Sequence, residues 1–299
     1  MLAMPEDLLC YKQIKIQNKD KAQFFLNQHS TKEGSWGRLT LKAGTIDFIF
    51  MDQDNNELSC QRLSLDHPDV IIFPGALHRI KLIDTDNFSA DINFYCLPHR
   101  YFPKKYALGN VHSDLLYAYN NYFPKQKKLT VLDVGCGSGR NLLFLAKQGH
   151  SVTGLDINNA AIEKIQGISL QEQMDNIKTI CTDLNMPIKL VDDAYDLIIS
   201  TVSLQFLHPS RVASLLIQLR AATKVGGIHL LVFPIEKTPF QLPEKFTFLP
   251  QEKELYEDYQ NAGWALFEYK ETVGQLHKLD EFGSPIQGMF GFLLAQRIH

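Results

Sequence analysis

A glycine-rich stretch in the middle of the chain, VLDVGCGSG at residues 131–139, constrains the fold more than any other feature of the sequence. It begins as an apolar run, passes through glycines at alternate positions and continues into RNLLFLA at 140–146, where apolar residues have helical spacing. This order predicts a buried strand, a tight turn and a helix start, which together let a ligand lie against bare backbone. Glycine suits such a turn because a Cβ would block the ligand and because glycine tolerates positive φ.

Two common phosphate-binding motifs do not fit this stretch. A dinucleotide-binding turn would need a third glycine where Arg140 stands, and a P-loop would need a lysine after its glycines. Instead, Asp133 precedes Gly135 and Gly137, and an acidic residue there favours a cationic or hydroxyl-bearing ligand. The pattern resembles motif I of the class I S-adenosylmethionine-dependent methyltransferases, whose cofactor carries a sulfonium and an amino group. The resemblance implies that Asp133, Gly135, Gly137 and Arg140 bind S-adenosyl-L-methionine.

A second predicted strand ends in Asp156, which lies 17 residues after Gly139. In a βαβ unit, that distance brings a carboxylate to the ribose of a bound nucleotide, where it can accept from both hydroxyls. Asp156, with Ile157 beside it, is therefore predicted to bind the cofactor. The alternative is that Asp156 only caps the helix predicted to follow.

A third strand signal ends in another acidic residue. Residues 177–184 alternate in polarity and end in Asp183 and Leu184, and residues 195–201 form an apolar run typical of a central strand. The resemblance to methyltransferases implies that Asp183 and Leu184 lie at the adenine and that Thr201 lies near the methyl donor.

The remaining signals complete an α/β fold. A helix is predicted over 209–222, followed by a glycine cap and a strand at 228–233. Residues 267–273 and 289–295 are predicted to form an antiparallel pair. The order predicts the Rossmann-like, seven-stranded sheet of class I methyltransferases, with helices on both faces.

Composition excludes several classes of function. The chain has 299 residues and a net charge of −3, which gives no electrostatic basis for binding nucleic acid or anionic membrane. No apolar run approaches the roughly 20 residues of a membrane-spanning helix. The five cysteines lack metal-ligand or disulfide-framework spacing, so we expect free thiols, no metal site and a cytoplasmic location.

The first 98 residues differ from the rest of the chain in their pattern of apolar and polar residues. Six short segments of alternating polarity, separated by turn signals, predict a small antiparallel β domain. The segment Pro74–His78 is similar to a turn of cupin-like barrels, but the histidines lack the H-x-H pair of a cupin metal site, so a packed or surface role is favoured for His78. We expect a cupin-like domain at 1–98, with a structural, oligomerisation or ligand-binding role left open, and the methyltransferase domain at 99–299.

Segments on both sides of the glycine-rich turn narrow the resemblance to one family. These segments are Tyr106 with His112-Ser113, Gly135 to Asn141, Ser200 to Val202, Val225 to Gly227, and Gly274 to Asp280. In this order they resemble the TehB-type tellurite-resistance methyltransferases, whose longer members carry an N-terminal β-rich domain. The resemblance implies a small-molecule acceptor such as a tellurite or selenite oxyanion, with His277, Lys278 and His112 as catalytic donors and Tyr106 over the cofactor or at the domain joint.

The sequence also departs from this family. Pro285 stands where relatives have an arginine after the His-Lys segment, and Gly109 to Val111 replace a stretch with another arginine. Charged donors bind oxyanions most strongly, so either the acceptor differs or a cation comes from elsewhere. Two alternatives stay open: a methyltransferase of another soft nucleophile such as a thiol, and a sensor that binds the cofactor without chemistry, with homo-oligomerisation compatible with each.

Overall fold

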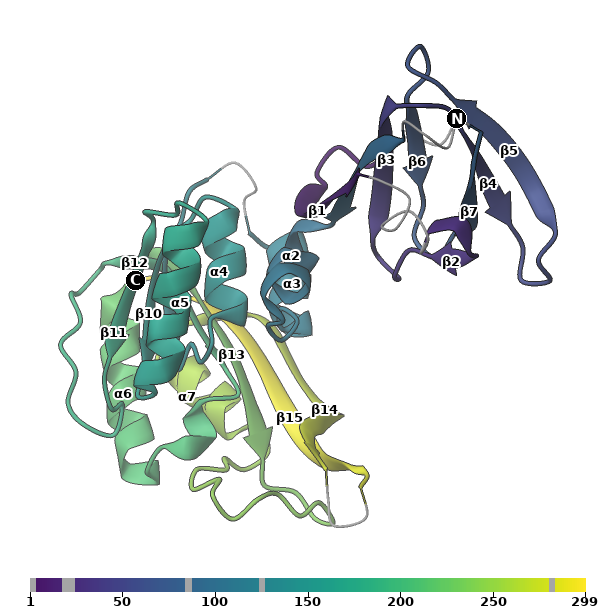
Figure 1. Cartoon of the computed structure of the whole chain (residues 1–299). Helices are drawn as coiled ribbons and strands as arrows, with labels where there is room; N and C mark the ends of the chain where they lie inside the picture. The colour runs from purple at the N-terminus through teal and green to yellow at the C-terminus, as the bar shows by residue number, and fades with distance from the viewer. Residues whose placement is uncertain (1–3, 18–24, 84–87, 124–126, 280–282) are drawn as a thin grey trace. The chain divides into compact units, whose positions relative to one another are not determined.

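The computed structural model describes residues 4–17, 25–83, 88–123, 127–279 and 283–299, and the chain forms two compact units, Met1–Leu108 and Gly109–His299 (Figure 1). The first unit extends past the predicted joint. Its last elements, η1 (Pro98–Arg100) and α2 (Tyr101–Tyr106), belong to it because Arg100 and Lys104 both donate to the carbonyl of Glu33.

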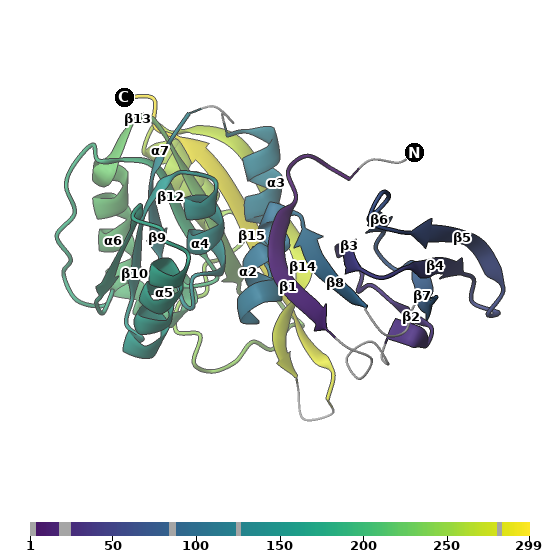
Figure 2. The same ribbon diagram turned by 45° about the horizontal axis from the view of Figure 1, so that its top comes forward.

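The first unit consists of two four-stranded antiparallel sheets, with orders β1-β8-β3-β6 and β2-β7-β4-β5 (Figure 2). Its strands are β1 (Leu9–Gln17), β2 (His29–Ser30), β3 (Trp36–Ala43), β4 (Ile46–Met51), β5 (Glu57–Leu63), β6 (Asp69–Ile72), β7 (Leu77–Leu82) and β8 (Ser89–Cys96). The predicted antiparallel β domain is confirmed. Strands β1 and β2 were not predicted, because a bulge between Cys10 and Lys12 interrupts the alternation of β1 and β2 has only two residues.

The two sheets enclose an apolar core that includes His78. This imidazole is 3% exposed, stacks on Phe48 at 5.1 Å and lies 4.2 Å from the ring of His29. Burial lowers the pKa of His78 to about 4, so the side chain is neutral and packed.

The second unit is built on one seven-stranded sheet of order β11-β10-β9-β12-β13-β15-β14 (Figure 1). Its elements are α3 (Ser113–Asn121), β9 (Thr130–Val134), α4 (Arg140–Lys147), β10 (Ser151–Asp156), α5 (Asn159–Gln171), β11 (Ile177–Cys181), β12 (Tyr195–Thr201), η2 (Leu204–Phe206), α6 (Pro209–Ala222), β13 (Thr223–Ile235), α7 (Glu254–Asn261), β14 (Ala265–Leu279) and β15 (Pro285–Gln296). The first five strands of that order are parallel, and β15 runs antiparallel to both of its neighbours. The predicted sheet and C-terminal pair are confirmed.

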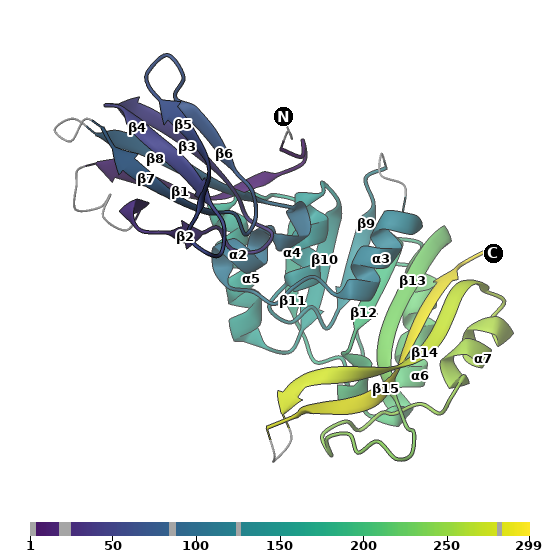
Figure 3. The same ribbon diagram turned by 90° about the vertical axis from the view of Figure 1, so that its right-hand side faces the viewer.

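Helices cover both faces of this sheet, with α3, α4 and α5 on one face and α6 and α7 on the other (Figure 3). Strand residues such as Leu132, Ile198 and Leu231 form one core with Leu215 and Leu219 of α6. Because side chains alternate along a strand, neighbouring residues serve the opposite face, and both faces are buried as in other parallel sheets. Strands of this kind all end at one edge, which is where the polar residues of the motifs gather.

No helix of the described residues has the length and apolarity that crossing a bilayer requires.

Candidate functional site

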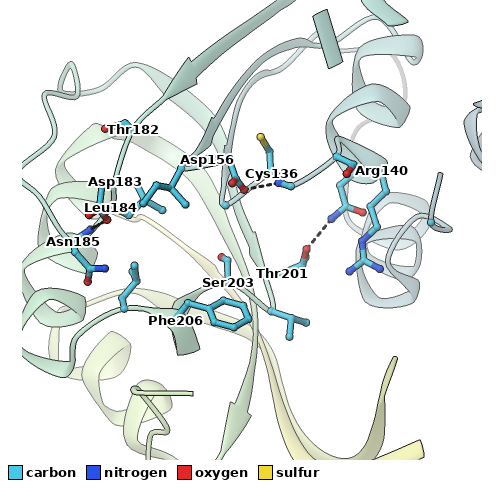
Figure 4. Close-up of a pocket in the computed structure, with 18 residues that line it drawn as sticks. Cys136, Arg140, Asp156, Thr182, Asp183, Leu184, Asn185, Thr201, Ser203 and Phe206 are labelled. Atoms are coloured by element: carbon cyan, nitrogen blue, oxygen red, sulfur yellow. Dashed lines mark hydrogen bonds between the residues drawn. The ribbon is translucent and has the colours of Figure 1, made fainter. Parts of the chain in front are cut away.

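A cleft of about 560 Å³ lies at the carboxyl ends of the parallel strands (Figure 4). Ligand sites of open α/β sheets are expected at this edge. Most of the residues predicted to bind the cofactor line it, namely Gly135, Gly137, Arg140, Asp156, Ile157, Asp183, Leu184 and Thr201.

The glycine-rich turn forms one wall of the cleft. Gly135 and Cys136 both donate their backbone N–H to the carbonyl of Leu155, which fixes the turn against β10. Gly135 has φ +75°, and a Cβ there would meet the Cβ of Ser203 at 2.4 Å. A Cβ on Gly137, by contrast, would meet nothing within 4 Å. The lack of a side chain at Gly137 therefore leaves space for a ligand at this point of the turn.

Asp156 connects the turn to the end of β10. Its Oδ2 accepts from the N–H of Gly137 at 2.7 Å, and its Oδ1 accepts from the N–H of Asn158 at 2.9 Å. A carboxylate offers about four lone-pair positions, so two remain for hydroxyls of a ligand. The helix that follows is capped by the side chain of Asn158 and not by Asp156.

The far end of the cleft combines polar and apolar groups. Asp183 accepts from the N–H of Asn185 at 2.9 Å, which orients its carboxylate. Ile157, Leu184 and Phe206 also line the cleft and add apolar surface, and Ile157 is 65% exposed. A cleft that combines exposed apolar side chains with an oriented carboxylate suits a flat heterocycle with an exocyclic amine.

Asp133 does not line the cleft, in contrast to its neighbours in the motif. Its side chain is 1% exposed and accepts from the N–H of Leu142 in the first turn of α4. Since the N-cap of α4 is Gly139, which has no side chain, Asp133 supplies the missing cap from β9. Burial raises the pKa of Asp133 to about 7, and among the described residues its Oδ2 has no hydrogen-bond partner.

Behind the turn, a buried amide joins three elements. The Nδ2 of Asn141 donates to Oγ1 of Thr201 at 2.8 Å, and its Oδ1 accepts from the N–H of His112 at 3.0 Å. Asn141 is 3% exposed, so neither bond is exchanged with bulk water. The end of β12, the start of α4 and the start of α3 are thereby held together.

A second cavity, of about 640 Å³, adjoins the cleft. It lies between the start of α3 and the strands β13, β14 and β15, and it shares Gly109, Arg140 and Val202 with the cleft. Val202 has φ +56°, which is unusual for a β-branched residue and marks a strained backbone. We call these residues, Gly109, Arg140 and Val202, the shared wall.

The predicted catalytic residues are described to different extents. His112 lines the second cavity, and its Nδ1 accepts from the N–H of Asp114 at 3.3 Å. His277 and Lys278 belong to β14 just after Leu276, another lining residue, but their side chains lie outside the described part of the structure. Tyr106 ends α2 in the first unit, where its ring stacks on Phe102 at 6.1 Å.

Sequence reasoning missed Ser203 and did not predict the roles of Val202 and Asn141, although both belong to the motif segments. Ser203 donates to the carbonyl of Val134 and is the side chain that requires glycine at 135. The positive φ of Val202 and the bridging bonds of Asn141 were equally invisible, because valine carries no turn signal and a buried asparagine cannot be distinguished from an exposed one in a single sequence. Only the position of Asn141 next to Arg140 in the motif pointed to the site.

The cleft fits S-adenosylmethionine on several observations. It offers an open backbone at Gly137, a carboxylate with free lone pairs at Asp156 and an apolar wall at Ile157. The sheet order, the helices on both faces and this cleft define a class I S-adenosylmethionine-dependent methyltransferase.

Comparisons with known proteins narrow the class to a family. A model of the tellurite resistance protein TehB matches residues 94–294, and a model of the TehB-like domain matches residues 12–92. The chain therefore belongs to the TehB family, whose members are S-adenosylmethionine-dependent methyltransferases.

Individual relatives agree with this assignment. A Haemophilus influenzae protein named "Probable S-adenosyl-L-methionine-dependent methyltransferase TehB" is 35% identical over 98% of this chain and 100% of its own. Hemagglutinin 1 of Eikenella corrodens is 31% identical over 85% of this chain and 82% of its own. The crystal structure of TehB from Haemophilus influenzae matches with a TM-score of 0.89 at 34% identity, over 98% of this chain and 100% of that one.

Proposed function

We propose that this protein methylates a small oxyanion of the tellurite or selenite type, with S-adenosylmethionine as methyl donor. The observation that carries the proposal is the pair of adjoining cavities. The cleft suits the cofactor, and a second cavity of about 640 Å³ beside it has the volume of a small-molecule site. The family model named for tellurite resistance supports the acceptor class.

The cleft residues would hold the cofactor in one orientation. We propose that Asp156 binds the ribose hydroxyls, that Asp183 and Leu184 hold the adenine, and that Gly137 presents its backbone to the remainder. When bound, the cofactor supplies a methyl group on a positively charged sulfur. Holding the acceptor in line with that group provides much of the rate enhancement.

Residues around the second cavity would bind the acceptor. Te(IV) and Se(IV) oxyanions carry a lone pair that attacks carbon directly, so no strong general base is required. We propose His277, Lys278 and His112 as donors to the oxyanion. Since Nδ1 of His112 accepts a backbone hydrogen bond, we propose Nε2 as the nitrogen that donates to the oxyanion.

The five cysteines, Cys10, Cys60, Cys96, Cys136 and Cys181, are all free. Unpaired thiols are typical of reducing compartments, and on this ground we propose a cytoplasmic site of action. Burial raises the pKa of Cys136 in the turn, which makes it a poor nucleophile and supports direct transfer to the acceptor.

The proposal is tested by incubating the purified protein with methyl-labelled cofactor and either tellurite, selenite or a small thiol. We expect the label to appear in a soluble methylated tellurium or selenium oxyanion, with S-adenosylhomocysteine as the second product, and a loss of at least about tenfold in rate with His277→Ala. His67→Ala, which changes an exposed histidine of the first unit, is the matched control. Cofactor binding without turnover of any acceptor would favour the sensor alternative, and turnover of the thiol alone would identify a different acceptor class.

A further inference from the structure

Arg140 differs from every other arginine in the described residues. The guanidinium groups of the other seven hydrogen-bond to a carboxylate or a carbonyl, while that of Arg140 makes no hydrogen bond or ion pair with any described residue. The side chain is only partly exposed, and burial lowers its pKa. The buried carboxyl of Asp133 interacts electrostatically with Arg140 but forms no hydrogen bond or ion pair with it, and burial raises the pKa of that carboxyl to about 7. A partly buried guanidinium whose donors are unsatisfied is unfavourable, so Arg140 is suited to an anion that arrives from solution.

The position of Arg140 points to the acceptor and not to the adenosine. Figure 4 shows its guanidinium at the end of the cleft opposite to Asp183 and Asn185. Arg140 belongs to the shared wall, so its side chain borders the second cavity as well as the cleft. The cofactor's own carboxylate has an alternative partner in the backbone N–H groups at the start of α4.

The other described charged groups around the second cavity do not pair with Arg140. Asp114 is the acidic residue among the described lining residues, and its Oδ1 lies 3.3 Å from Nζ of Lys270. Its Oδ2 lies 3.7 Å from Nδ1 of His112. Since Lys270 offsets the charge of Asp114, the guanidinium of Arg140 is the charged group of the described lining that has no ion-pair partner.

The rest of the shared wall keeps Arg140 in place. An added Cβ on Gly109 would lie 3.7 Å from Cδ of Arg140, so the glycine backbone runs close along the side chain. The N–H of Val202 donates to the carbonyl of Val232 at 2.7 Å, and its carbonyl accepts from Gln205. These bonds fix the strained residue, so the border between the two cavities is built from anchored backbone.

We propose that the second cavity is the acceptor site and that Arg140 binds a small anionic acceptor at the border with the cofactor cleft. This inference takes the reaction, methyl transfer, from the proposed function. The binding of the anion by Arg140 does not depend on that function. A planar guanidinium can bind two oxygens of one oxyanion in parallel, which a lysine cannot do.

The test is a calorimetric titration of sodium selenite into protein saturated with S-adenosylhomocysteine, the demethylated product. We expect Arg140→Gln to weaken selenite binding about 10- to 100-fold, as for loss of charged hydrogen bonds. Arg140→Lys should give an intermediate Kd. Lys164→Gln, which removes one exposed positive charge from α5, should bind selenite like the wild type.

Titration of S-adenosylhomocysteine into each variant distinguishes the two ligands. We expect its Kd to change less than about threefold in Arg140→Gln, which also shows that the variant is folded. If instead Arg140→Gln weakens both ligands equally, or leaves selenite binding unchanged, the inference is wrong. If wild-type protein binds selenite through Arg140 but methylates no acceptor, the inference stands and the proposed function fails.

Discussion

The cofactor cleft and the second cavity are neighbours, but the chain builds them in opposite ways. The cleft is formed by successive βα units, and its bonds join the ends of adjacent strands, as between Asp156 and Gly137. The second cavity combines the start of α3 with strands near the end of the chain, such as β14 and β15. A local sequence motif is therefore enough to predict the cleft, whereas the second cavity forms only when distant segments of the chain come together.

This contrast predicts that substitutions in the cleft weaken binding of the cofactor, and that substitutions at the shared wall affect the acceptor. Three further variants test the contrast, beginning with the one for which we expect the largest effect.

Asp156→Ala should greatly weaken binding of the cofactor. The change removes the acceptor for the N–H groups of Gly137 and Asn158 together with the proposed ribose contacts. We expect the Kd for S-adenosylhomocysteine to rise about 100-fold or more in calorimetry. Asp175→Ala, at an exposed position after α5, is the control. A change below about threefold in Asp156→Ala would remove the basis for the assigned cofactor orientation.

Asp133→Asn should alter how stability depends on pH. Because the pKa of Asp133 is raised from 3.8 to about 7, the folded state binds this proton more tightly than the unfolded chain. The Asp133 contribution to the free energy of unfolding therefore falls as pH rises from about 4 to about 7, by a few kcal/mol, and then levels off. Urea denaturation of the ligand-free protein between pH 5 and pH 8 should show that the free energy of unfolding of the variant, relative to wild type, increases as the pH rises to about 7.

The difference between variant and wild type is the quantity to compare in that experiment. The buried His78 and His229 have pKa values lowered to about 4 and about 3, and they contribute the opposite slope to both proteins. Subtraction cancels them. Identical profiles for Asp133→Asn and wild type would mean that Asp133 is ionised in the folded protein at neutral pH.

Val202→Gly should have the smallest effect on stability and a selective effect on turnover. Glycine adopts the positive φ of residue 202 without strain, which stabilises the folded state. Glycine also loses more backbone entropy on folding than valine does. The two effects oppose each other, so the free energy of unfolding should change by less than about 1 kcal/mol. Loss of the side chain from the shared wall should lower kcat with selenite about three- to tenfold through poorer positioning. Val191→Gly, in an exposed loop, should leave kcat unchanged, and equal kcat values for both variants would show that the wall does not position the acceptor.

The sequence was most informative where function depends on neighbouring residues. The order of strands and helices after residue 129 predicted the seven-stranded sheet, and helix 209–222 was predicted with the bounds of α6. The glycine-rich turn and the acids at strand ends also reach one cleft, as expected. Short-range periodicity and turn chemistry are properties of adjacent residues, so one sequence is enough to reveal them.

The sequence was less informative where a role depends on direction or long-range contact. Asp133 belongs to the motif, but strand alternation turns its side chain toward α4, where it caps the helix, and not into the cleft. Strand β1 was missed because a bulge between Cys10 and Lys12 limits its alternation to the second half of the strand. The shared wall could not be predicted, because its residues come from three separate segments of the chain. The local sequence around Val202 also gives no indication of its positive φ.

The shared wall also has a consequence for chemical probes. An adenosine that carries a short anionic arm could occupy both cavities at once, because Gly109, Arg140 and Val202 line both of them. Joining two weak ligands turns the second binding event into an intramolecular one, with an effective concentration on the order of millimolar. The border between the cavities is thus a template for a bisubstrate inhibitor, in which the length of the arm sets the selectivity.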